Sequence, residues 1–149
     1  MAVNLRAVLS DKCNYRCVFC SRDFNRTLNA DISSEFLETC ITAFASLGGC
    51  KVTYTGGEPL MYPELCRIMR LVHSLNMENS ITTNGSLLAL QDEEFFTLAD
   101  ALNISIPSFN PEEYTRLTGG TSLDDVKRSA VKCAGLGLKV KINCSRTVH

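Results

Sequence analysis

Residues 51–59 read Lys51-Val52-Thr53-Tyr54-Thr55-Gly56-Gly57-Glu58-Pro59 and pass from a strand-like run into a turn. The first five are mostly β-branched or aromatic, which favours a β-strand. Apolar residues at helical spacing precede this run, from an N-cap at Ser33 to about Leu47, and Gly48-Gly49 ends them. A second amphipathic stretch starts at about Pro63. Residues 51–59 are therefore expected to contain a strand that lies between two helices.

The same order repeats along the chain. Further strands are expected at residues 5–10, 80–83, 102–106 and 139–144, and further helices are expected after N-caps at Asp92 and Ser122. Strands that alternate with helices form βαβ units and a parallel sheet. The sequence thus predicts an α/β fold of about five βα units in one domain, residues 1–149.

Apolar and polar residues alternate within the expected strands. Val140 and Ile142 alternate with Lys141 and Asn143, and residues 102–106 follow the same pattern. A period of two places each set on one face of the sheet, so one face should pack against helices while the other stays polar. A polar face suggests a curved sheet whose concave side holds a ligand. An open sheet with one solvated face is the alternative.

Composition and charge exclude several classes of protein. The chain has 149 residues, 45% of them apolar, with 15 Lys and Arg against 16 Asp and Glu, a net charge of −1. This balance is typical of a globular domain, and it gives no reason to expect binding to nucleic acid or to an anionic membrane. The sequence shows neither a transmembrane run nor a signal peptide at its N-terminus, so a cytoplasmic location is expected.

Three of the eight cysteines crowd into the segment Cys13-Asn14-Tyr15-Arg16-Cys17-Val18-Phe19-Cys20. A disulfide scaffold is disfavoured without an export signal, so the cluster points to metal binding. Structural zinc takes four ligands and no histidine lies near, whereas three cysteines on an iron–sulfur cluster would leave one iron open. Zinc and three unrelated buried cysteines remain as alternatives. The other five cysteines are expected to be buried for structural reasons; they are Cys40, Cys50, Cys66, Cys133 and Cys144.

The turn Gly56-Gly57-Glu58-Pro59 is a second candidate site. Glycines allow the backbone to approach a ligand closely, and a glutamate carboxylate accepts hydrogen bonds from an ammonium group. Pro59 suits the first turn of a helix. An ordinary turn between a strand and a helix is the alternative.

The cysteine motif, with Phe19 just before its last cysteine, resembles the radical S-adenosylmethionine (radical SAM) superfamily, and the Gly56–Pro59 turn resembles its second motif. The resemblance implies that Cys13, Cys17 and Cys20 bind three irons of a [4Fe–4S] cluster. It also implies that S-adenosylmethionine chelates the fourth iron, with Phe19 beside the adenine and the turn at the methionine end. The implied fold is a partial (β/α) barrel with its helices outside. The implied activity is reductive cleavage to a 5′-deoxyadenosyl radical that abstracts hydrogen from a substrate.

Further segments resemble the GTP cyclase family of molybdenum-cofactor synthesis, including residues 82–85, 103–105, 111–119 and 139–143. That resemblance implies cofactor contacts from Thr82, Asn84, Ser105 and Lys141, and a substrate contact from Arg6. The chain also departs from the cyclase pattern. Thr53 stands where the cyclases have arginine, Ile106-Pro107 replaces Leu-Asp, and the cysteines of a second cluster are not reproduced. The substrate, a small molecule or a peptide, is therefore left unidentified.

The superfamily barrel usually has six strands, and only five are expected here. We therefore expect a radical SAM core over residues 1–149 that is incomplete at its C-terminus, with the strand at 139–144 as an uncovered edge. A homodimer or a missing C-terminal segment would cover that edge. The implied partner is a cytosolic electron donor such as a flavodoxin or ferredoxin. Two alternatives to the enzyme stay open: a non-catalytic iron–sulfur or zinc module, and a truncated remnant that binds cofactor without turnover.

Overall fold

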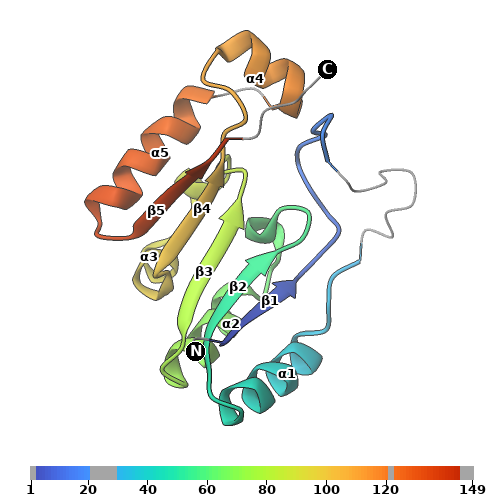
Figure 1. The fold of residues 1–149 in the computed structure, drawn as a ribbon, viewed down its shortest axis with the longest axis vertical. Coiled ribbons are helices and arrows are strands. Elements are labelled where there is room, and N and C mark those ends of the chain that lie inside the picture. The colour runs from blue at the N-terminus through green and yellow to red at the C-terminus, as the bar shows by residue number, and fades with distance from the viewer. Residues whose placement is uncertain (1–2, 21–29, 121–122, 145–149) are drawn as a thin grey trace.

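The protein contains one five-stranded parallel sheet with the strand order β1-β2-β3-β4-β5 (Figure 1). A computed structural model describes residues 3–20, 30–120 and 123–144. The strands are β1 Val3–Val8, β2 Gly49–Thr55, β3 Glu78–Thr83, β4 Ala101–Ser105 and β5 Lys139–Asn143. Each strand pairs with the next one along the chain, as successive right-handed crossovers produce. The predicted α/β fold with five βα units is confirmed.

Helices connect the strands and cover one face of the sheet. They are α1 Ser34–Ser46, α2 Leu65–Ser74, α3 Glu93–Leu98, α4 Pro111–Thr118 and α5 Leu123–Gly135, with 3₁₀ turns η1 Pro59–Met61 and η2 Leu88–Leu90. In Figure 1, α2 and α3 lie behind the sheet. The predicted N-caps Ser33 and Asp92 are confirmed, since their side chains accept hydrogen bonds from the Phe36 and Phe95 amides. Ser122 lies outside the described residues.

The core lies between the helices and the apolar face of the sheet. Val52, Ile81, Leu102 and Ile104 are fully buried on the apolar face. Thr53, Asn103 and Lys141 lie on the opposite, polar face. The residues that pair in register on this polar face include Arg6–Thr53, Thr53–Ser80, Thr82–Asn103 and Asn103–Lys141. The alternation read from the sequence therefore describes the two faces correctly.

A polar junction inside the core joins β2 to the helices. The Tyr54 hydroxyl donates to Asn79 Oδ1 (2.6 Å), and Asn79 Nδ2 donates to the carbonyls of Met69 and Leu98 at 3.0 Å each. Both side chains are fully buried, so these hydrogen bonds offset the cost of removing their polar atoms from water.

Some boundaries and burial predictions were wrong. The first strand ends at Val8 rather than residue 10, because Ser10 turns away to form a bridge with Asp31. Helix α2 begins at Leu65, after a turn at Pro63, and α4 was not predicted from periodicity because it is only eight residues long. Cys133 is buried, and Cys40 and Cys66 are partly buried as expected. Cys50 and Cys144 are exposed instead, since Cys50 lies at the start of β2, where the register with Val3 and Asn4 is irregular, and Cys144 follows the end of β5.

No helix in the described parts of the chain combines the length and apolar character needed to span a membrane. The strands β1 and β5 form the two edges of the sheet within the same described residues.

Candidate functional site

The two sequence motifs meet at the carboxyl ends of the strands. The cysteine segment (residues 13–20) follows β1, and the glycine turn (residues 56–59) follows β2. Further polar residues lie at the ends of β3 and β4. They line one cavity of about 200 Å³. Its lining residues are Cys13, Tyr15, Cys17, Phe19, Cys20, Thr55, Gly56, Gly57, Glu58, Thr82, Thr83, Asn84, Ser105 and Thr118. Ligand sites in parallel βα folds lie at this end of the strands.

The glycine turn holds the chain just before the cysteines. The amide of Gly57 donates to the Ser10 carbonyl (2.8 Å), and the amide of Glu58 donates to the Lys12 carbonyl (2.7 Å). Gly56 has a φ of 138°, and a Cβ atom there would collide with the Ser10 carbonyl oxygen. Glycine is therefore required at residue 56 for two reasons, its backbone conformation and the close approach of the first loop.

The cysteine segment has no regular secondary structure, so its shape depends on contacts with other segments. The amides of Arg16 and Val18 donate to the carbonyls of Thr118 (3.1 Å) and Leu117 (2.9 Å) at the end of α4. The amide of Tyr15 donates to Cys13 Sγ (3.4 Å), and Cys17 Sγ lies 3.8 Å from the Thr118 carbonyl oxygen. These contacts place all three thiols on the wall of the same cavity.

The three thiols fit a polynuclear cluster better than a single ion. In the described part of the chain, no three His, Cys, Asp or Glu side chains lie close enough together to hold one metal ion. In a [4Fe–4S] cluster each cysteine binds a different iron, so the sulfurs stand farther apart than they do around one zinc ion. The cavity is lined by three cysteines and by the carboxylate of Glu58, whose oxygens already accept hydrogen bonds from the protein.

Glu58 is buried, and its carboxylate already accepts three hydrogen bonds from the protein. It is 1% exposed, and its carboxylate accepts from Thr83 Oγ1 (2.6 Å), the Asn84 amide (2.8 Å) and the Leu60 amide (3.1 Å). Burial raises the pKa of the Glu58 carboxyl, and these three hydrogen bonds oppose that rise. A carboxylate has about four acceptor positions, so about one remains for a ligand.

Asn84 links the end of β3 to the cysteine segment. Its Nδ2 donates to Asn14 Oδ1 (2.9 Å), and Asn14 Nδ2 donates to Ser86 Oγ (2.8 Å). Ser86 closes the network, since its hydroxyl donates to Asn84 Oδ1 (2.6 Å). The Asn84 side chain is therefore held by the protein while it lines the cavity.

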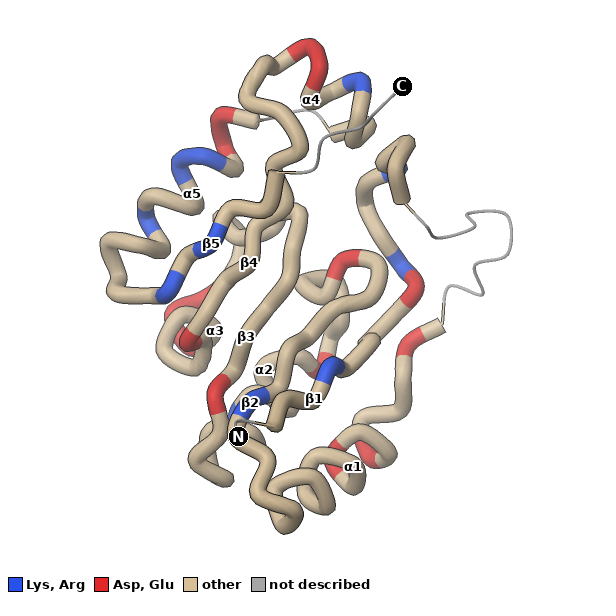
Figure 2. Tube along the Cα trace, viewed as in Figure 1, with Lys and Arg blue, Asp and Glu red and all other residues tan. Residues whose placement is uncertain are grey.

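The polar face of the sheet carries an excess of positive charge: Figure 2 shows Lys and Arg residues in β1, β2 and β5, and the strand register places them on this face. Glu78 is paired with Lys51 (3.0 Å) and Lys139 (3.8 Å). Arg6 and Lys141 lie on the same face, and neither has an ion-pair partner among the described residues. Since the whole chain has a net charge of −1, this face is more basic than the rest of the protein.

Ten of the thirteen residues predicted for the site line the cavity, and three do not. Pro59 is buried as the first residue of η1, while Lys141 and Arg6 lie on the exposed polar face. Four further residues line the cavity that sequence analysis did not assign: Tyr15, Thr55, Thr83 and Thr118. The first three adjoin the motifs and could have been found from them. Thr118 is about a hundred residues from the cysteines, and local sequence gives no signal for its position.

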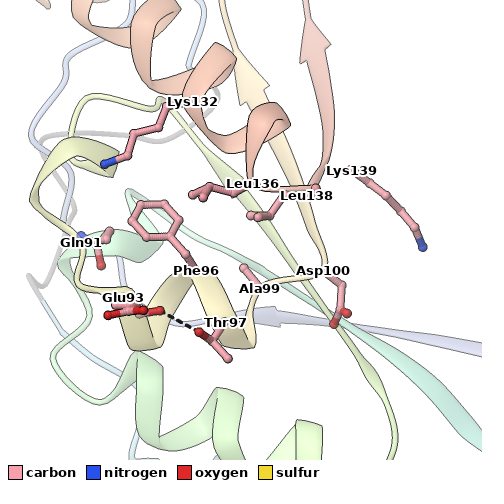
Figure 3. Close-up of a pocket in the computed structure, with 11 residues that line it drawn as sticks. Gln91, Glu93, Phe96, Thr97, Ala99, Asp100, Lys132, Leu136, Leu138 and Lys139 are labelled. Atoms are coloured by element: carbon pink, nitrogen blue, oxygen red, sulfur yellow. Dashed lines mark hydrogen bonds between the residues drawn. The ribbon is translucent and has the colours of Figure 1, made fainter.

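A larger cavity of about 740 Å³ lies at the opposite end of the strands, between α3 and α5 (Figure 3). Phe96, Leu136 and Leu138 form its apolar wall, and the Lys132 ammonium lies 5.6 Å from the centre of the Phe96 ring. It contains none of the predicted site residues and no thiol, so its size does not make it the site of the chemistry.

Residues 7–148 match the Radical SAM superfamily, and the chain belongs to it. The cofactors of this superfamily are a [4Fe–4S] cluster and S-adenosylmethionine, and the three thiols beside the glycine turn fit both.

Among curated proteins, the chain is similar to the probable GTP 3′,8-cyclase of Thermococcus kodakarensis, with 34% identity over 142 residues. That match covers 94% of this chain and 46% of the cyclase. The GTP 3′,8-cyclase of Rhodopseudomonas palustris is 36% identical over 153 residues, covering 93% of this chain and 43% of the cyclase. The chain thus spans about half the length of these curated relatives.

Among solved structures, Streptococcus suis SuiB bound to the precursor peptide SuiA has the same fold, with a TM-score of 0.84 and 20% identity. The match covers 99% of this chain and 34% of SuiB. Methylornithine synthase gives a TM-score of 0.72 at 20% identity, covering 96% of this chain and 44% of the synthase. The predicted partial barrel is therefore confirmed.

Single Cys→Ala changes should separate the three predicted cluster ligands from the other cysteines. Cys13→Ala, Cys17→Ala and Cys20→Ala should each abolish iron retention after anaerobic reconstitution, because each removes one ligand of a three-ligand site. Iron content per chain is the measurement. Cys50→Ala, at an exposed thiol outside the cavity, is the control and should keep wild-type iron. Loss of iron in Cys50→Ala or Cys133→Ala, with the fold intact, would contradict the assignment.

Proposed function

We propose that this chain is the catalytic core of a radical SAM enzyme. The proposal is carried by one observation: three thiols and the turn at Gly56, Gly57 and Glu58 line a single cavity at the carboxyl ends of the strands. When bound, the cluster and S-adenosylmethionine supply a 5′-deoxyadenosyl radical for hydrogen abstraction from a substrate. An external electron donor, such as a flavodoxin or ferredoxin in the cytoplasm, is the proposed partner.

Each cavity residue that was predicted from the sequence has a proposed role. Cys13, Cys17 and Cys20 bind three irons, and the glycine turn receives the methionine end of S-adenosylmethionine. Phe19, which is 38% exposed at the cavity, lies beside the adenine. The polar side chains that end β3 and β4 contact the rest of the cofactor; they are Thr82, Asn84 and Ser105.

The decisive experiment is anaerobic incubation with dithionite and S-adenosylmethionine. We expect four irons per chain, a visible absorption band and formation of 5′-deoxyadenosine, with none formed by Cys17→Ala. One zinc per chain and no colour would instead show a metal-binding module. Iron and cofactor binding without 5′-deoxyadenosine would show a remnant that no longer turns over.

Glu58→Gln tests the role of the turn in holding the cofactor. The change removes a charge-assisted acceptor worth about 1.5–3 kcal/mol, so affinity for S-adenosylmethionine should fall about tenfold to a hundredfold. Iron content should stay at the wild-type level, because the main-chain hydrogen bond from residue 58 to the Lys12 carbonyl, just before Cys13, does not involve the changed side chain. Glu112→Gln, at an exposed site on α4, is the control. Unchanged affinity in Glu58→Gln would mean that the carboxylate only holds the turn together.

The basic polar face favours an anionic substrate. Lys141 pairs in register with Asn103, and Asn103 pairs with Thr82, so Lys141 lies level with a residue of the cavity wall. Arg6 pairs with Thr53, and Thr53 pairs with Ser80, two residues nearer the amino end of β3 than Thr82. Two cations without ion-pair partners in the described residues, flanking the open face, attract a carboxylate or a phosphate.

Binding of GTP and of uncharged guanosine measures this preference for anions. GTP should bind more tightly than guanosine, and Lys141→Gln and Arg6→Gln should each weaken GTP binding by about tenfold or more, since each removes one charged contact. Calorimetry on the anaerobic protein gives the affinities. Lys127→Gln on α5 is the control and should change nothing. Equal binding of GTP and guanosine would refute the role of these cations.

A further inference from the structure

The end of α4 forms a support for the cysteine segment that lies about a hundred residues earlier in the chain. Two consecutive carbonyls, of Leu117 and Thr118, accept hydrogen bonds from the amides of Val18 and Arg16. Thr118 is 2% exposed, and its hydroxyl accepts from the Gly120 amide (3.0 Å). The support is therefore itself fixed by a buried hydrogen bond.

Gly120 makes this docking sterically feasible. A methyl group at residue 120 would overlap the Tyr15 ring, standing 2.5 Å from Cε2 and 2.6 Å from Oη. Gly120 has no positive φ, so close approach of the ring is the reason for glycine there. Any side chain at residue 120 would push Tyr15 out of its place.

The Tyr15 ring packs against a second buried ring. It is 7% exposed and packs edge-to-face on Tyr114, with ring centres 6.5 Å apart, and Tyr114 is fully buried. The two hydroxyls lie 3.4 Å apart. Displacing the ring breaks this contact with Tyr114 and strains the backbone between Cys13 and Cys17, on which Tyr15 sits.

We propose that Gly120 is a positioning residue, which holds the cysteine segment in its cluster-binding shape through Tyr15. The proposal rests on the proposed function for the identity of the cluster ligands. An irregular segment must be ordered by its surroundings before three thiols can bind one cluster, and ordering it in advance lowers the entropic cost of binding. Gly120, the two α4 carbonyls and Tyr15 provide that order in the cluster-free protein.

The test compares Gly120→Ala with Gly135→Ala. Gly135 ends α5, has no positive φ, and has no atom within 4 Å of an added Cβ, so it is a matched Gly→Ala control. In the cluster-free protein, hydrogen exchange of the Arg16 and Val18 amides should be about tenfold faster or more in Gly120→Ala. Exchange in β4 should be unchanged. After anaerobic reconstitution, Gly120→Ala should retain less than about half of the wild-type iron, whereas Gly135→Ala should match wild type.

A double variant keeps the test specific to the ring contact. Tyr15→Leu has no atom where the new methyl group meets the ring, so Tyr15→Leu with Gly120→Ala should retain as much iron as Tyr15→Leu alone. Unchanged exchange in Gly120→Ala overturns the proposal, and so does faster exchange with wild-type iron content. If the wild-type chain binds no iron, the proposed function fails, while the exchange measurement still decides whether Gly120 orders the segment.

Discussion

The site depends on one buried interaction, in which the Glu58 carboxylate accepts hydrogen bonds from Thr83 and Asn84. These bonds join the carboxyl ends of β2 and β3, and the Glu58 amide continues the connection to Lys12, just before the first cysteine. A buried carboxylate is stable only when its oxygens are satisfied, so these three segments must fold together. The glycine turn is therefore a structural junction as well as a proposed cofactor contact.

Around this junction the cavity is assembled from short connections rather than from regular elements. Main-chain hydrogen bonds join the glycine turn to the residues just before the cysteine segment, and the segment itself is held by main-chain bonds to the end of α4 and by side-chain bonds to Asn84 and Ser86. Rigid strands and helices supply fixed attachment points, and the loops supply the chemistry. This division explains why a segment without secondary structure can present three thiols to one cavity.

The polar face of the sheet sets this chain apart from the cyclase pattern that it resembles. Thr53 lies on this face in β2, next to the edge strand β1, where that pattern has arginine, and it pairs directly with Arg6 and with Ser80. Positive charge is therefore confined to the edges and to the amino end of the face. A substrate bound there would meet its charged contacts at Arg6 and Lys141 and neutral hydroxyls between them.

The sequence by itself determined the strands, most of the helices, the two faces of the sheet, and the two motifs of the site. Each of these depends on the local periodicity of apolar residues or on residues close together in the chain. It did not determine the exposure of Cys50 and Cys144, the helix at residues 111–118, or the hydrogen bonds that the Glu58 carboxylate accepts from Thr83 and Asn84. Only the tertiary structure decided that Thr118 and Gly120 support the cysteine segment. Contacts between residues so far apart in the chain depend on the order of the strands in the sheet and on how side chains pack in the space between the connecting segments.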